Sequence, residues 1–423
     1  MRIEPTRKGF LSSYPLHRHW RPESIGGVLE PKPLNVYLHS PYCIQRCAYC
    51  YFKTATIGET RRDEVDRYVG ALCREVELAA RHFNLGSRPV RTVYFGGGTP
   101  TLLSEANLKR LMRTLRENLA FDDPEIVMEA EPVTLTPAKA ETLKELGVNR
   151  ISLGIQSFRD EIVLRTGRHD KEVQALAAIE IAKSTGAVVN VDLLSGLAGE
   201  THETWAYSVE RAIEAGLHAV TVYKMELYAN TEYYSGVRQH TLDLPSDEME
   251  VELMSYAMDR LEGAGYLPVN FFTHTREGKY AQQHITNRWR GEDLFSLGVS
   301  AFGSFGSWSY QNTSDLGEYQ SQLEGGALPV LRGYTLSGLD LMVRDIVLGM
   351  KLLSLDLKEL RRRHGVDLKR LCAPALEELE RQELIRIEDA TLLLTRKGRL
   401  YGDTVGKALG ASLQQLMTGE APA

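Results

Sequence analysis

The chain has 423 residues, of which 43% are hydrophobic and 25% are charged, the balance of an ordinary soluble globular protein. This composition excludes a disordered chain, a coiled coil and a disulfide-stapled miniprotein. Lys and Arg total 50 against 56 Asp and Glu, so the net charge of −6 argues against a general binder of nucleic acid or anionic membranes.

Residues 1–33 are polar and contain several Pro and Gly, and we expect them to form an arm or lid without a fold of its own. The N-terminus lacks the apolar core of a signal peptide, and no stretch reaches the roughly 18 apolar residues that span a membrane. Five cysteines are too few for a disulfide framework in a chain of this length. We therefore expect a cytoplasmic protein in a reducing compartment.

Short β-rich runs alternate with helical segments between residues 34 and 240. The runs fall at 35–39, 92–95, 125–129, 150–153, 188–193 and 219–223. Helical periods include 62–82 and 104–119, the second with Ser104 as its N-cap. This alternation predicts an α/β fold with a parallel sheet. Six strands favour a partial (βα)6 TIM-like barrel over a closed barrel of eight, and chemistry in such folds lies at the C-terminal ends of the strands.

The pattern changes after residue 240, which predicts a barrel extension over 241–335 and a small terminal domain over 336–423. In the extension we expect an amphipathic helix at 242–265, a polar loop at 273–290 and a Gly/Ser/aromatic stretch at 296–312. The terminal domain has helical patterns at 340–353, 356–364 and 373–381, followed by a hairpin at 384–388 and 391–395. These elements predict a winged-helix-like α+β module, and its many acidic residues argue against DNA binding.

Three of the five cysteines, Cys43, Cys47 and Cys50, follow the first predicted strand directly. A structural zinc site requires four ligands, and the sequence offers no fourth Cys or second Cys-x2-Cys pair. A [4Fe–4S] cluster has four corners, so three cysteines leave one iron open to chelate an amine and a carboxylate. The spacing therefore predicts an iron–sulfur cluster, with buried or zinc-bound cysteines as the alternative.

The C-x3-C-x2-C spacing, with the aromatic Tyr49 before its last cysteine, resembles the radical S-adenosylmethionine (SAM) superfamily. Further blocks are similar, in this order, to the oxygen-independent coproporphyrinogen III oxidase (HemN-like) family: YLHSPYC at 37–43, YFGGGTP at 94–100, SLGIQSF at 152–158 and DLLSGL at 192–197. The segment LGVSA at 297–301 and the terminal module also resemble that family. The resemblance covers roughly residues 34–405 and implies a radical SAM barrel with a HemN-like C-terminal domain.

The resemblance also implies which residues hold the cofactors. The three cysteines would bind a [4Fe–4S] cluster with SAM at its open iron, and the remaining SAM contacts would be Tyr37, Tyr49, Gly97, Gly98, Thr99, Glu129, Gln156, Arg168, Asp192 and Leu194. Glycines after a strand allow close approach and offer free N–H groups to an anion, although a tight turn is the alternative. Glu129 could instead be a surface carboxylate, with Glu131 the other candidate for exposure.

Arg168 would supply a fork for a carboxylate, and Asp192 would be costly to bury without a ligand or partner, with a structural salt bridge as the alternative for both. A second SAM site beside the first would be lined by Val299, Ala301 and Phe302, and the alternative is a loop that closes the barrel. Glu226, after the sixth strand, is a candidate polar contact to SAM or a base for proton transfer.

The sequence departs from two branches of the family at residues 51 and 52. Coproporphyrinogen oxidases carry a further cysteine where this chain has Phe52, and heme chaperones usually carry an acidic residue where it has Tyr51. A third branch, the class C radical SAM methyltransferases, uses a second SAM to methylate or cyclopropanate an sp² carbon of a natural product. A tyrosine- and phenylalanine-rich pocket, formed by Tyr223, Tyr228, Tyr233, Tyr234, Phe271, Phe272 and Trp308, favours that branch.

The expected activity is therefore alkylation by two SAM molecules. The alternatives are oxidative decarboxylation of a coproporphyrinogen, heme trafficking, and a non-enzymatic iron–sulfur or heme carrier. The expected partners are an unsaturated or heteroaromatic small molecule, an electron donor such as flavodoxin or ferredoxin, and a methyltransferase-like partner protein.

Overall fold

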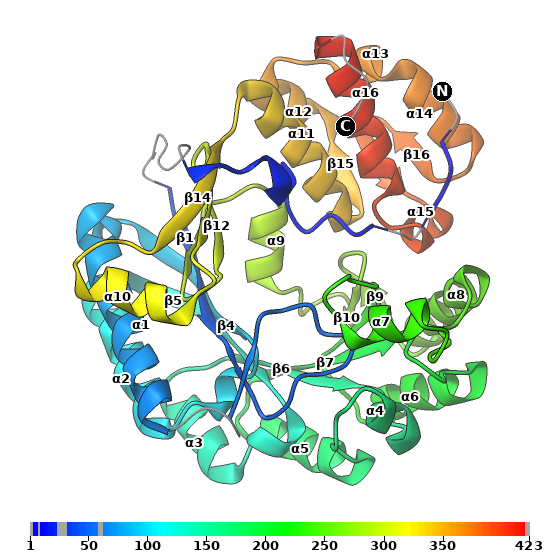
Figure 1. Ribbon diagram of the computed structural model, residues 1–423. Helices are drawn as coiled ribbons and strands as arrows, with labels where there is room; N and C mark the ends of the chain where they lie inside the picture. The colour runs from blue at the N-terminus through cyan, green and yellow to red at the C-terminus, as the bar shows by residue number, and fades with distance from the viewer. Residues whose placement is uncertain (1–2, 7–8, 23–31, 58–61, 419–423) are drawn as a thin grey trace.

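The computed structural model describes residues 3–6, 9–22, 32–57 and 62–418. Its main body is one curved sheet with the strand order β14-β13-β12-β11-β1-β4-β5-β6-β7-β8-β10-β9 (Figure 1). The six strands predicted from the sequence are consecutive and parallel within it: β1 (Leu34–Ser40), β4 (Pro89–Gly97), β5 (Ala120–Ala130), β6 (Arg150–Gln156), β7 (Val188–Ser195) and β8 (Ala219–Lys224). The predicted α/β partial barrel is confirmed.

Helices follow these strands along the chain, and most of them pack their apolar faces on the sheet, whereas α4 and α7 contribute Ile162 and Tyr233 to a separate cluster. They are α1 (Arg62–His82), α2 (Glu105–Asn118), α3 (Pro137–Glu145), α4 (Asp160–Arg165), α5 (Glu172–Ser184), α6 (His202–Glu214), α7 (Glu232–Arg238) and α8 (Asp247–Gly263). The Ser104 hydroxyl accepts a hydrogen bond from the Asn107 N–H, as expected of the predicted N-cap. Helix α8 begins at Asp247 rather than at residue 242, because Leu242 and Leu244 pack against a separate hydrophobic cluster that includes Tyr233.

Side chains alternate between the two faces of the sheet, and the alternation decides what the barrel contains. Leu34, Val36 and Leu38 of β1 are buried in the main hydrophobic core. The residues between them point to the concave face, where Asn35 accepts a hydrogen bond from Thr92 (3.0 Å) and Tyr37 stacks on Tyr94 at 5.8 Å between ring centroids. The concave interior is therefore polar and aromatic.

The segment at 273–290, expected to be a loop, forms strand β10 (Thr273–Arg276) and helix α9 (Gln283–Trp289), so that prediction is wrong. Helix α9 lies on the concave face. His284 Nδ1 shares a hydrogen bond with the Thr92 hydroxyl (2.7 Å), and the Asn287 amide donates to Asn35 Oδ1 (2.9 Å). A seven-residue helix whose polar side chains are satisfied by a polar barrel interior has no apolar periodicity to reveal it.

The sheet is extended at both edges. Strand β11 (Leu294–Leu297) runs parallel to β1, and the antiparallel strands β12 (Phe302–Phe305), β13 (Trp308–Asn312) and β14 (Val330–Thr335) continue from it. Strands β10 and β9 (Tyr266–Pro268) extend the edge at β8, and helix α10 (Leu316–Glu324) packs beside α1. The extension predicted for 241–335 thus completes the sheet of the barrel.

The C-terminal region forms a separate lobe in Figure 1 with its own hydrophobic core. Its helices are α11 (Gly338–Gly349), α12 (Leu357–His364), α13 (Leu368–Leu371), α14 (Ala373–Arg381), α15 (Arg396–Leu400) and α16 (Thr404–Thr418). Its strands are β15 (Ser354–Asp356), β16 (Ile385–Glu388) and β17 (Thr391–Leu394), in the order β15-β17-β16. The three predicted helices (α11, α12 and α14) and the hairpin are present, and α13, α15 and α16 are additional helices.

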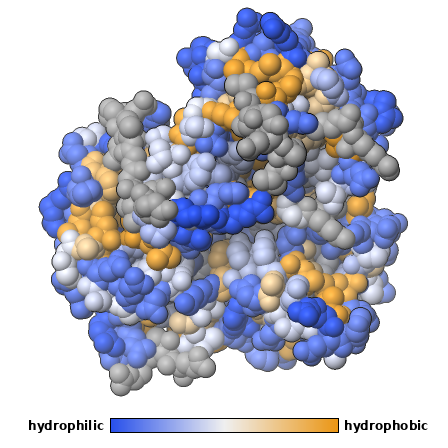
Figure 2. Space-filling view, turned by 45° about the horizontal axis from the view of Figure 1, so that its top comes forward, coloured by the Kyte–Doolittle hydropathy of each residue, from blue (hydrophilic) through white to orange (hydrophobic). Residues whose placement is uncertain are grey.

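The described residues of the N-terminal arm join this lobe to the barrel. Ile3 is buried in the core of the lobe, and the Leu11 N–H donates to Asp403 Oδ2 (2.6 Å). Further along, Arg21 pairs with Gly333 of β14. Within the described ranges, no helix is long and apolar enough to cross a membrane, and the face seen in Figure 2 carries separate hydrophobic patches on a mostly hydrophilic surface.

Candidate active site

Directly after β1, Cys43 ends the short strand β2 (Tyr42–Cys43), and Cys47 and Cys50 lie on the loop between it and its paired strand β3 (Ala55–Thr56). The loop is anchored at Ala48, whose N–H donates to Thr166 O (2.8 Å) and whose carbonyl accepts from the Tyr233 N–H (3.0 Å). Leu194, at the end of β7, belongs to the same small hydrophobic cluster as Ala48. The thiols are therefore fixed at the C-terminal edge of the sheet, as predicted.

All three thiols are free and partly buried. Burial raises the pKa of Cys43 to about 12 and that of Cys47 to about 11, so iron binding has to displace protons. In the described part of the chain, no group of three His, Cys, Asp or Glu side chains converges closely enough to hold a single metal ion. In a four-iron cluster each cysteine binds a different iron, so the thiols need not converge on one point. The donor set fits a cluster rather than zinc.

The glycine run at the end of β4 packs directly against the cysteine loop. Gly97 has a φ of +110°, and a Cβ on Gly98 would lie 2.5 Å from Tyr42 O and 2.9 Å from Cys43 Sγ. The N–H groups of Gly97, Gly98 and Thr99 donate to Glu129 Oε2, Ser40 O and Tyr42 O. The expectation that these N–H groups are free is therefore wrong, because close packing of the two loops uses them.

Glu129 and Asp192 place two carboxylates on the concave face. Tyr94 Oη donates to Glu129 Oε1 (2.5 Å), and Asp192 accepts from Ser152 Oγ (2.9 Å) and Asn190 Nδ2 (2.8 Å). Burial raises the pKa of Glu129 to about 7 and that of Asp192 to about 6. Neither carboxylate forms an ion pair with a described Lys, Arg or His. Two uncompensated acids suit a cationic ligand, and SAM carries a sulfonium and an ammonium group.

Arg168 is already paired within the protein. Its Nε and Nη2 donate to Asp170 Oδ2 (2.8 and 2.5 Å), and Nη2 lies 3.2 Å from Glu131 Oε1. Glu131, considered for exposure, is thus partly buried in an ion pair, while Glu129 faces the barrel interior. These contacts form the structural salt bridge that was the alternative for Arg168. Its Nε and Nη2 atoms are therefore already bonded to carboxylates of the protein.

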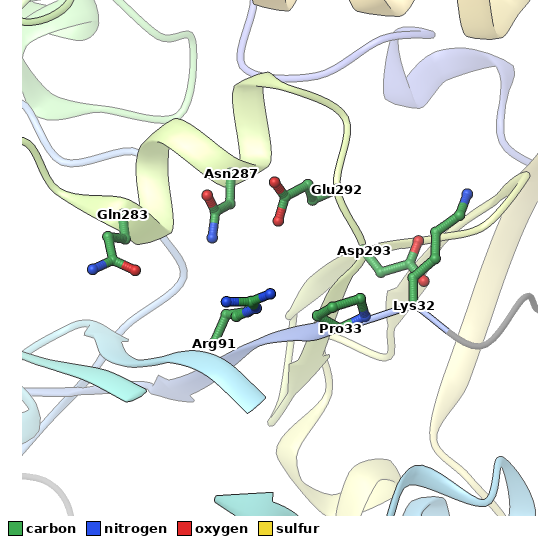
Figure 3. A pocket seen from close by; sticks show the side chains of 7 residues that line it. All are labelled: Lys32, Pro33, Arg91, Gln283, Asn287, Glu292 and Asp293. Atoms are coloured by element: carbon green, nitrogen blue, oxygen red, sulfur yellow. The ribbon is translucent and has the colours of Figure 1, made fainter. Parts of the chain in front are cut away.

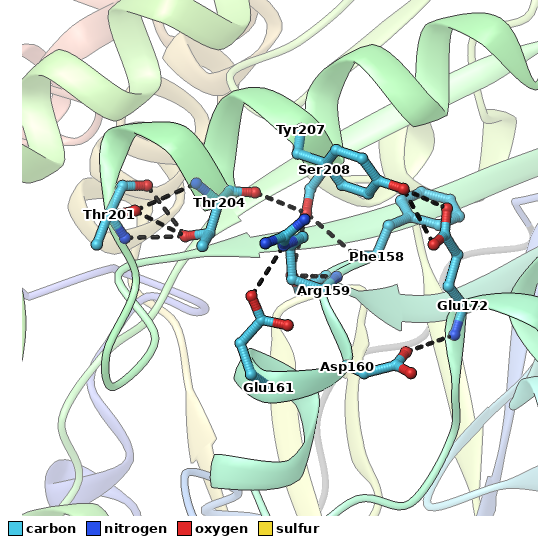
Figure 4. Close-up of polar contacts among 10 residues, drawn as sticks. Phe158, Arg159, Asp160, Glu161, Glu172, Thr201, Thr204, Tyr207 and Ser208 are labelled. Atoms are coloured by element: carbon cyan, nitrogen blue, oxygen red, sulfur yellow. Dashed lines mark hydrogen bonds and ion pairs between the residues drawn. The ribbon is translucent and has the colours of Figure 1, made fainter.

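Gln156 lies at an irregularity between β6 and β7 with a φ of +71°. Its Nε2 is 3.0 Å from the position of a Cβ on Gly154, and Arg168 Nη1 is 3.9 Å from the same point. The loop that follows is tied to α6, because the Phe158 N–H donates to Ser208 Oγ (3.0 Å; Figure 4). The fold therefore holds Gln156 rigidly at the edge of the candidate site.

Aromatic side chains surround the mouth of the barrel beside the cysteine loop. Tyr51 stacks on Phe52 with ring centroids 4.3 Å apart and contacts Tyr228 at 4.1 Å. Tyr223 packs on Phe272 at 5.2 Å. Tyr51, Phe52 and Tyr223 are each about 40% exposed, which leaves their rings accessible to a ligand. The residues predicted to form one aromatic pocket therefore do not all line the same space. Tyr233 packs under the cysteine loop, and Trp308 stacks on Tyr310 in the core.

The remaining predicted residues lie around this region. Tyr37 shares a hydrogen bond with His39 Nδ1 (3.1 Å), and Tyr49 hydrogen-bonds Cys47 and packs edge-on against Tyr233. Glu226 follows β8, is partly buried close to Tyr228, and has no hydrogen bond or ion pair to another described residue. The positions of Tyr37, Tyr49 and Glu226 are compatible with their predicted roles, which stay predictions.

The loop predicted to line a second SAM site abuts the end of β1. Tyr68 Oη donates to His39 O (2.6 Å), and the Val299 N–H donates to Tyr68 Oη (3.3 Å). Val299 and Ala301 are buried, and Phe302 is stacked by His17 of the arm at 4.2 Å. The loop therefore lies beside the cysteine site, while protein covers the side chains that were expected to line the second site.

A pocket of about 360 Å³ lies on the other side of α9, lined by Lys32, Pro33, Arg91, Gln283, Asn287, Glu292 and Asp293 (Figure 3). Pro33 and Arg91 flank the N-terminal ends of β1 and β4, at the opposite end of the strands from the cysteines. Because active sites of βα barrels lie at the C-terminal ends, this pocket is not the candidate site.

Two residues of the site were not anticipated from the sequence. Tyr94, which bonds Glu129, is signalled by the alternation of polar and apolar residues along its strand. Arg288 belongs to α9 and is partly buried; burial lowers its pKa, and the nearby Tyr51, Tyr37 and Tyr94 oppose this effect. Arg288 carried no signal, because its segment has no recognisable pattern.

The raised pKa of Glu129 predicts how SAM affinity depends on pH. Burial and Asp192 favour the protonated form of Glu129 below about pH 7, and a protonated acid binds a cation or a ribose hydroxyl less well than a carboxylate. SAM affinity should therefore rise between about pH 5.5 and 7.5 and then level off. Equilibrium dialysis of the reconstituted protein would measure this. In Glu129→Gln the rise should shrink to the part due to Asp192, and an unchanged profile would contradict the assignment.

Comparison with known proteins agrees with this geometry. The radical SAM superfamily profile matches residues 37–212, and the HemN C-terminal domain profile matches residues 336–401. The heme chaperone HemW of Mycobacterium tuberculosis is 32% identical over 89% of this chain and 95% of its own. The oxygen-independent coproporphyrinogen III oxidase of Pseudomonas aeruginosa is 30% identical over 87% and 83%. The solved structure of Escherichia coli coproporphyrinogen III oxidase (HemN) superposes with a TM-score of 0.82 at 25% identity, over 95% of this chain and 97% of that one.

Proposed function

The chain belongs to the radical SAM superfamily, in the group with HemN-type coproporphyrinogen III oxidases and HemW heme chaperones, and we propose that it cleaves SAM reductively beside a bound tetrapyrrole. Its cofactors are a [4Fe–4S] cluster and SAM. Both relatives, which match most of this chain, are named for tetrapyrroles: heme in one and a coproporphyrinogen in the other. Their likeness supports a tetrapyrrole ligand better than it supports alkylation of a natural product.

The observation that carries the proposal is the stacked aromatic group at the barrel mouth. Tyr51, Phe52 and Tyr228 lie beside the cysteine loop with ring centroids 4.1–4.3 Å apart, and the first two are about 40% exposed. Exposed flat rings next to a redox centre suit a flat conjugated ligand, which stacks on them at little entropic cost. Tyr51 and Phe52 also replace the residues typical of the oxidases and chaperones, so the bound tetrapyrrole would be contacted differently here.

Different residues of the chain would have different roles in such a site. Cys43, Cys47 and Cys50 would hold the cluster, and Glu129 and Asp192 offer carboxylates to the cationic groups of SAM. The cluster and SAM, when bound by these residues, would supply the one-electron chemistry for hydrogen abstraction from the substrate. Helix α9 packs on the concave face and the arm packs against β12 and β14, so both would help to shield a bound substrate from water.

A second candidate is alkylation by two SAM molecules, as expected from the sequence. The observation in its favour is that the loop at 298–302 abuts the end of β1 beside the cysteine site. A methyltransferase-like partner protein belongs to this candidate alone. Both candidates need an external one-electron donor, for which a flavodoxin or ferredoxin is expected, and both need the reducing conditions of a cytoplasm.

One assay separates the two candidates. The protein would be reconstituted anaerobically with iron and sulfide and given dithionite, SAM and either heme or coproporphyrinogen III, with unsaturated heteroaromatics in parallel. The proposal expects 5′-deoxyadenosine that rises at least several-fold with a tetrapyrrole and little S-adenosylhomocysteine. Equal amounts of both products, with a methylene mass gain on a heteroaromatic acceptor, would favour alkylation instead. If the protein binds a tetrapyrrole but does not cleave SAM, heme trafficking or a non-enzymatic carrier role would be the remaining function.

A further inference from the structure

One arginine of helix α9, Arg288, lacks the acidic partner that the buried arginines of this protein have. Arg88, Arg150, Arg168 and Arg344 are buried, and each forms an ion pair with an Asp or Glu. Arg288 is only partly buried, and its one hydrogen bond within the described residues is from Nη2 to Ser12 O (2.8 Å). A guanidinium has five N–H donors, so the described residues leave most of the hydrogen-bonding capacity of Arg288 unused.

The surroundings of Arg288 leave its charge uncompensated. Burial lowers its pKa, and the groups that oppose this effect are tyrosines, namely Tyr51, Tyr37 and Tyr94, rather than carboxylates. A guanidinium nevertheless stays charged at neutral pH. A partly buried charge without a counter-ion is costly, and Tyr51 of the aromatic group is near enough to affect this one. An anionic ligand in the barrel would remove that cost.

A second arginine without an acid lies near the first. Arg332 of β14 donates from Nε to Gln311 Oε1 (2.8 Å) and forms no ion pair with a described residue. His17 lies near both arginines: its own burial, then Arg332 and then Arg288, lower its pKa to about 4. His17 is therefore neutral at pH 7 and does not add a third cation. The wall formed by α9, β14 and the arm is thus basic, whereas Glu129 and Asp192 across the interior are acidic.

We propose that Arg288, with Arg332 beside it, binds a carboxylate of the substrate and so sets which edge of the substrate enters the barrel. This inference rests on the proposed function and adds to it that the tetrapyrrole carries at least one free carboxylate on the side facing α9. The acidic pair would then hold SAM, while the arginine orients the substrate between SAM and the arm. The guanidinium geometry suits a bidentate carboxylate contact.

The test compares a porphyrin with the same porphyrin lacking its charges. Absorbance titrations of the full reconstituted chain would use protoporphyrin IX and its dimethyl ester. The wild type should bind the free acid more tightly than the ester. Arg288→Gln should weaken binding of the free acid about 10- to 100-fold, the size of a lost charge-assisted pair, and leave the ester unaffected. Arg290→Gln, an exposed arginine two residues further on, serves as the matched control and should behave as wild type.

Three results would overturn the inference. The first is equal binding of acid and ester by the wild type, and the second is an Arg288→Gln variant that binds the acid as wild type does. The third is a loss of SAM affinity in Arg288→Gln while porphyrin binding is kept, which would assign the carboxylate to SAM. Circular dichroism and iron content of each variant would establish that a loss of binding is not a loss of folding.

A second arm separates this inference from the proposed function. If the wild type binds neither porphyrin, the tetrapyrrole proposal fails, and the carboxylate site is then tested with propionate alone. Phenylglyoxal modifies accessible arginines, and peptide mass spectrometry would follow residues 288 and 290. Protection of Arg288 but not Arg290 by millimolar propionate would support the carboxylate site. Modification of both residues at unchanged rates would overturn it.

Discussion

Replacement of Cys43, Cys47 or Cys50 by alanine should each reduce 5′-deoxyadenosine formation to the enzyme-free background. The three thiols lie on one loop, and the sequence offers no neighbouring cysteine to take over, because residue 52 is phenylalanine. A cluster held by two thiolates would have two irons without a protein ligand. SAM would then no longer have a single open iron to bind. Iron and sulfide content, electron paramagnetic resonance with and without SAM, and product quantification would follow the effect.

Cys73 provides the control for this series. It is buried in α1 among hydrophobic residues, away from the loop, so Cys73→Ala should retain the cluster and SAM cleavage at close to wild-type levels. Full activity in any one of the three loop variants would exclude the cluster assignment. Loss of activity in Cys73→Ala with an intact cluster would instead point to damage from the core substitution.

Replacement of Asp403 by alanine should destabilise the junction of arm, lobe and barrel by about 3–5 kcal/mol, the usual cost of leaving a buried charge unpaired. Lys351 is fully buried, its ammonium pairs with Asp403 Oδ1, and it lies 4.1 Å from the centre of the Phe10 ring. Asp403 Oδ2 also accepts the Leu11 N–H (2.6 Å). The substitution therefore leaves the Lys351 ammonium without its partner and removes the hydrogen bond that holds Leu11 of the arm. Urea unfolding, with limited proteolysis of the arm, would measure both effects.

A double variant tests whether charge is the cause. In Lys351→Met/Asp403→Asn no ammonium remains, and the amide oxygen introduced at residue 403 can still accept the Leu11 N–H. Most of the lost stability should return, so the two substitutions should be strongly non-additive. If the double variant is as unstable as Asp403→Ala, the loss comes from packing and not from the stranded charge.

The local parts of this protein could be predicted from residues close together in the sequence. The six parallel strands and α1 follow from periodicity and β-rich runs, the start of α2 follows from Ser104, and the cysteine loop follows from its spacing. Each of these signals acts over a few residues, so no tertiary partner is needed to recognise it. The fold class and the cofactor class therefore follow from local patterns alone.

Other features were decided by contacts between distant segments. Helix α9 forms because Asn35 and Thr92, hundreds of positions away along the chain, satisfy its polar side chains. Arg168 pairs with Glu131 of a neighbouring segment, and the N–H groups of the glycine run are used by Glu129, Ser40 and Tyr42. Pairing of this kind depends on which strands are neighbours and on their register.

The strands, the principal helices, the cysteine loop and the class of cofactor can be predicted from local spacing in the sequence. Which polar groups are already satisfied, and which are left for a ligand, depends on how distant segments meet in the folded barrel. Arg168 and Arg288 are alike as residues in the sequence, but one meets two carboxylates and the other meets three tyrosines. A charge is available for binding only when the fold leaves it without a partner, and that is a property of the assembled barrel.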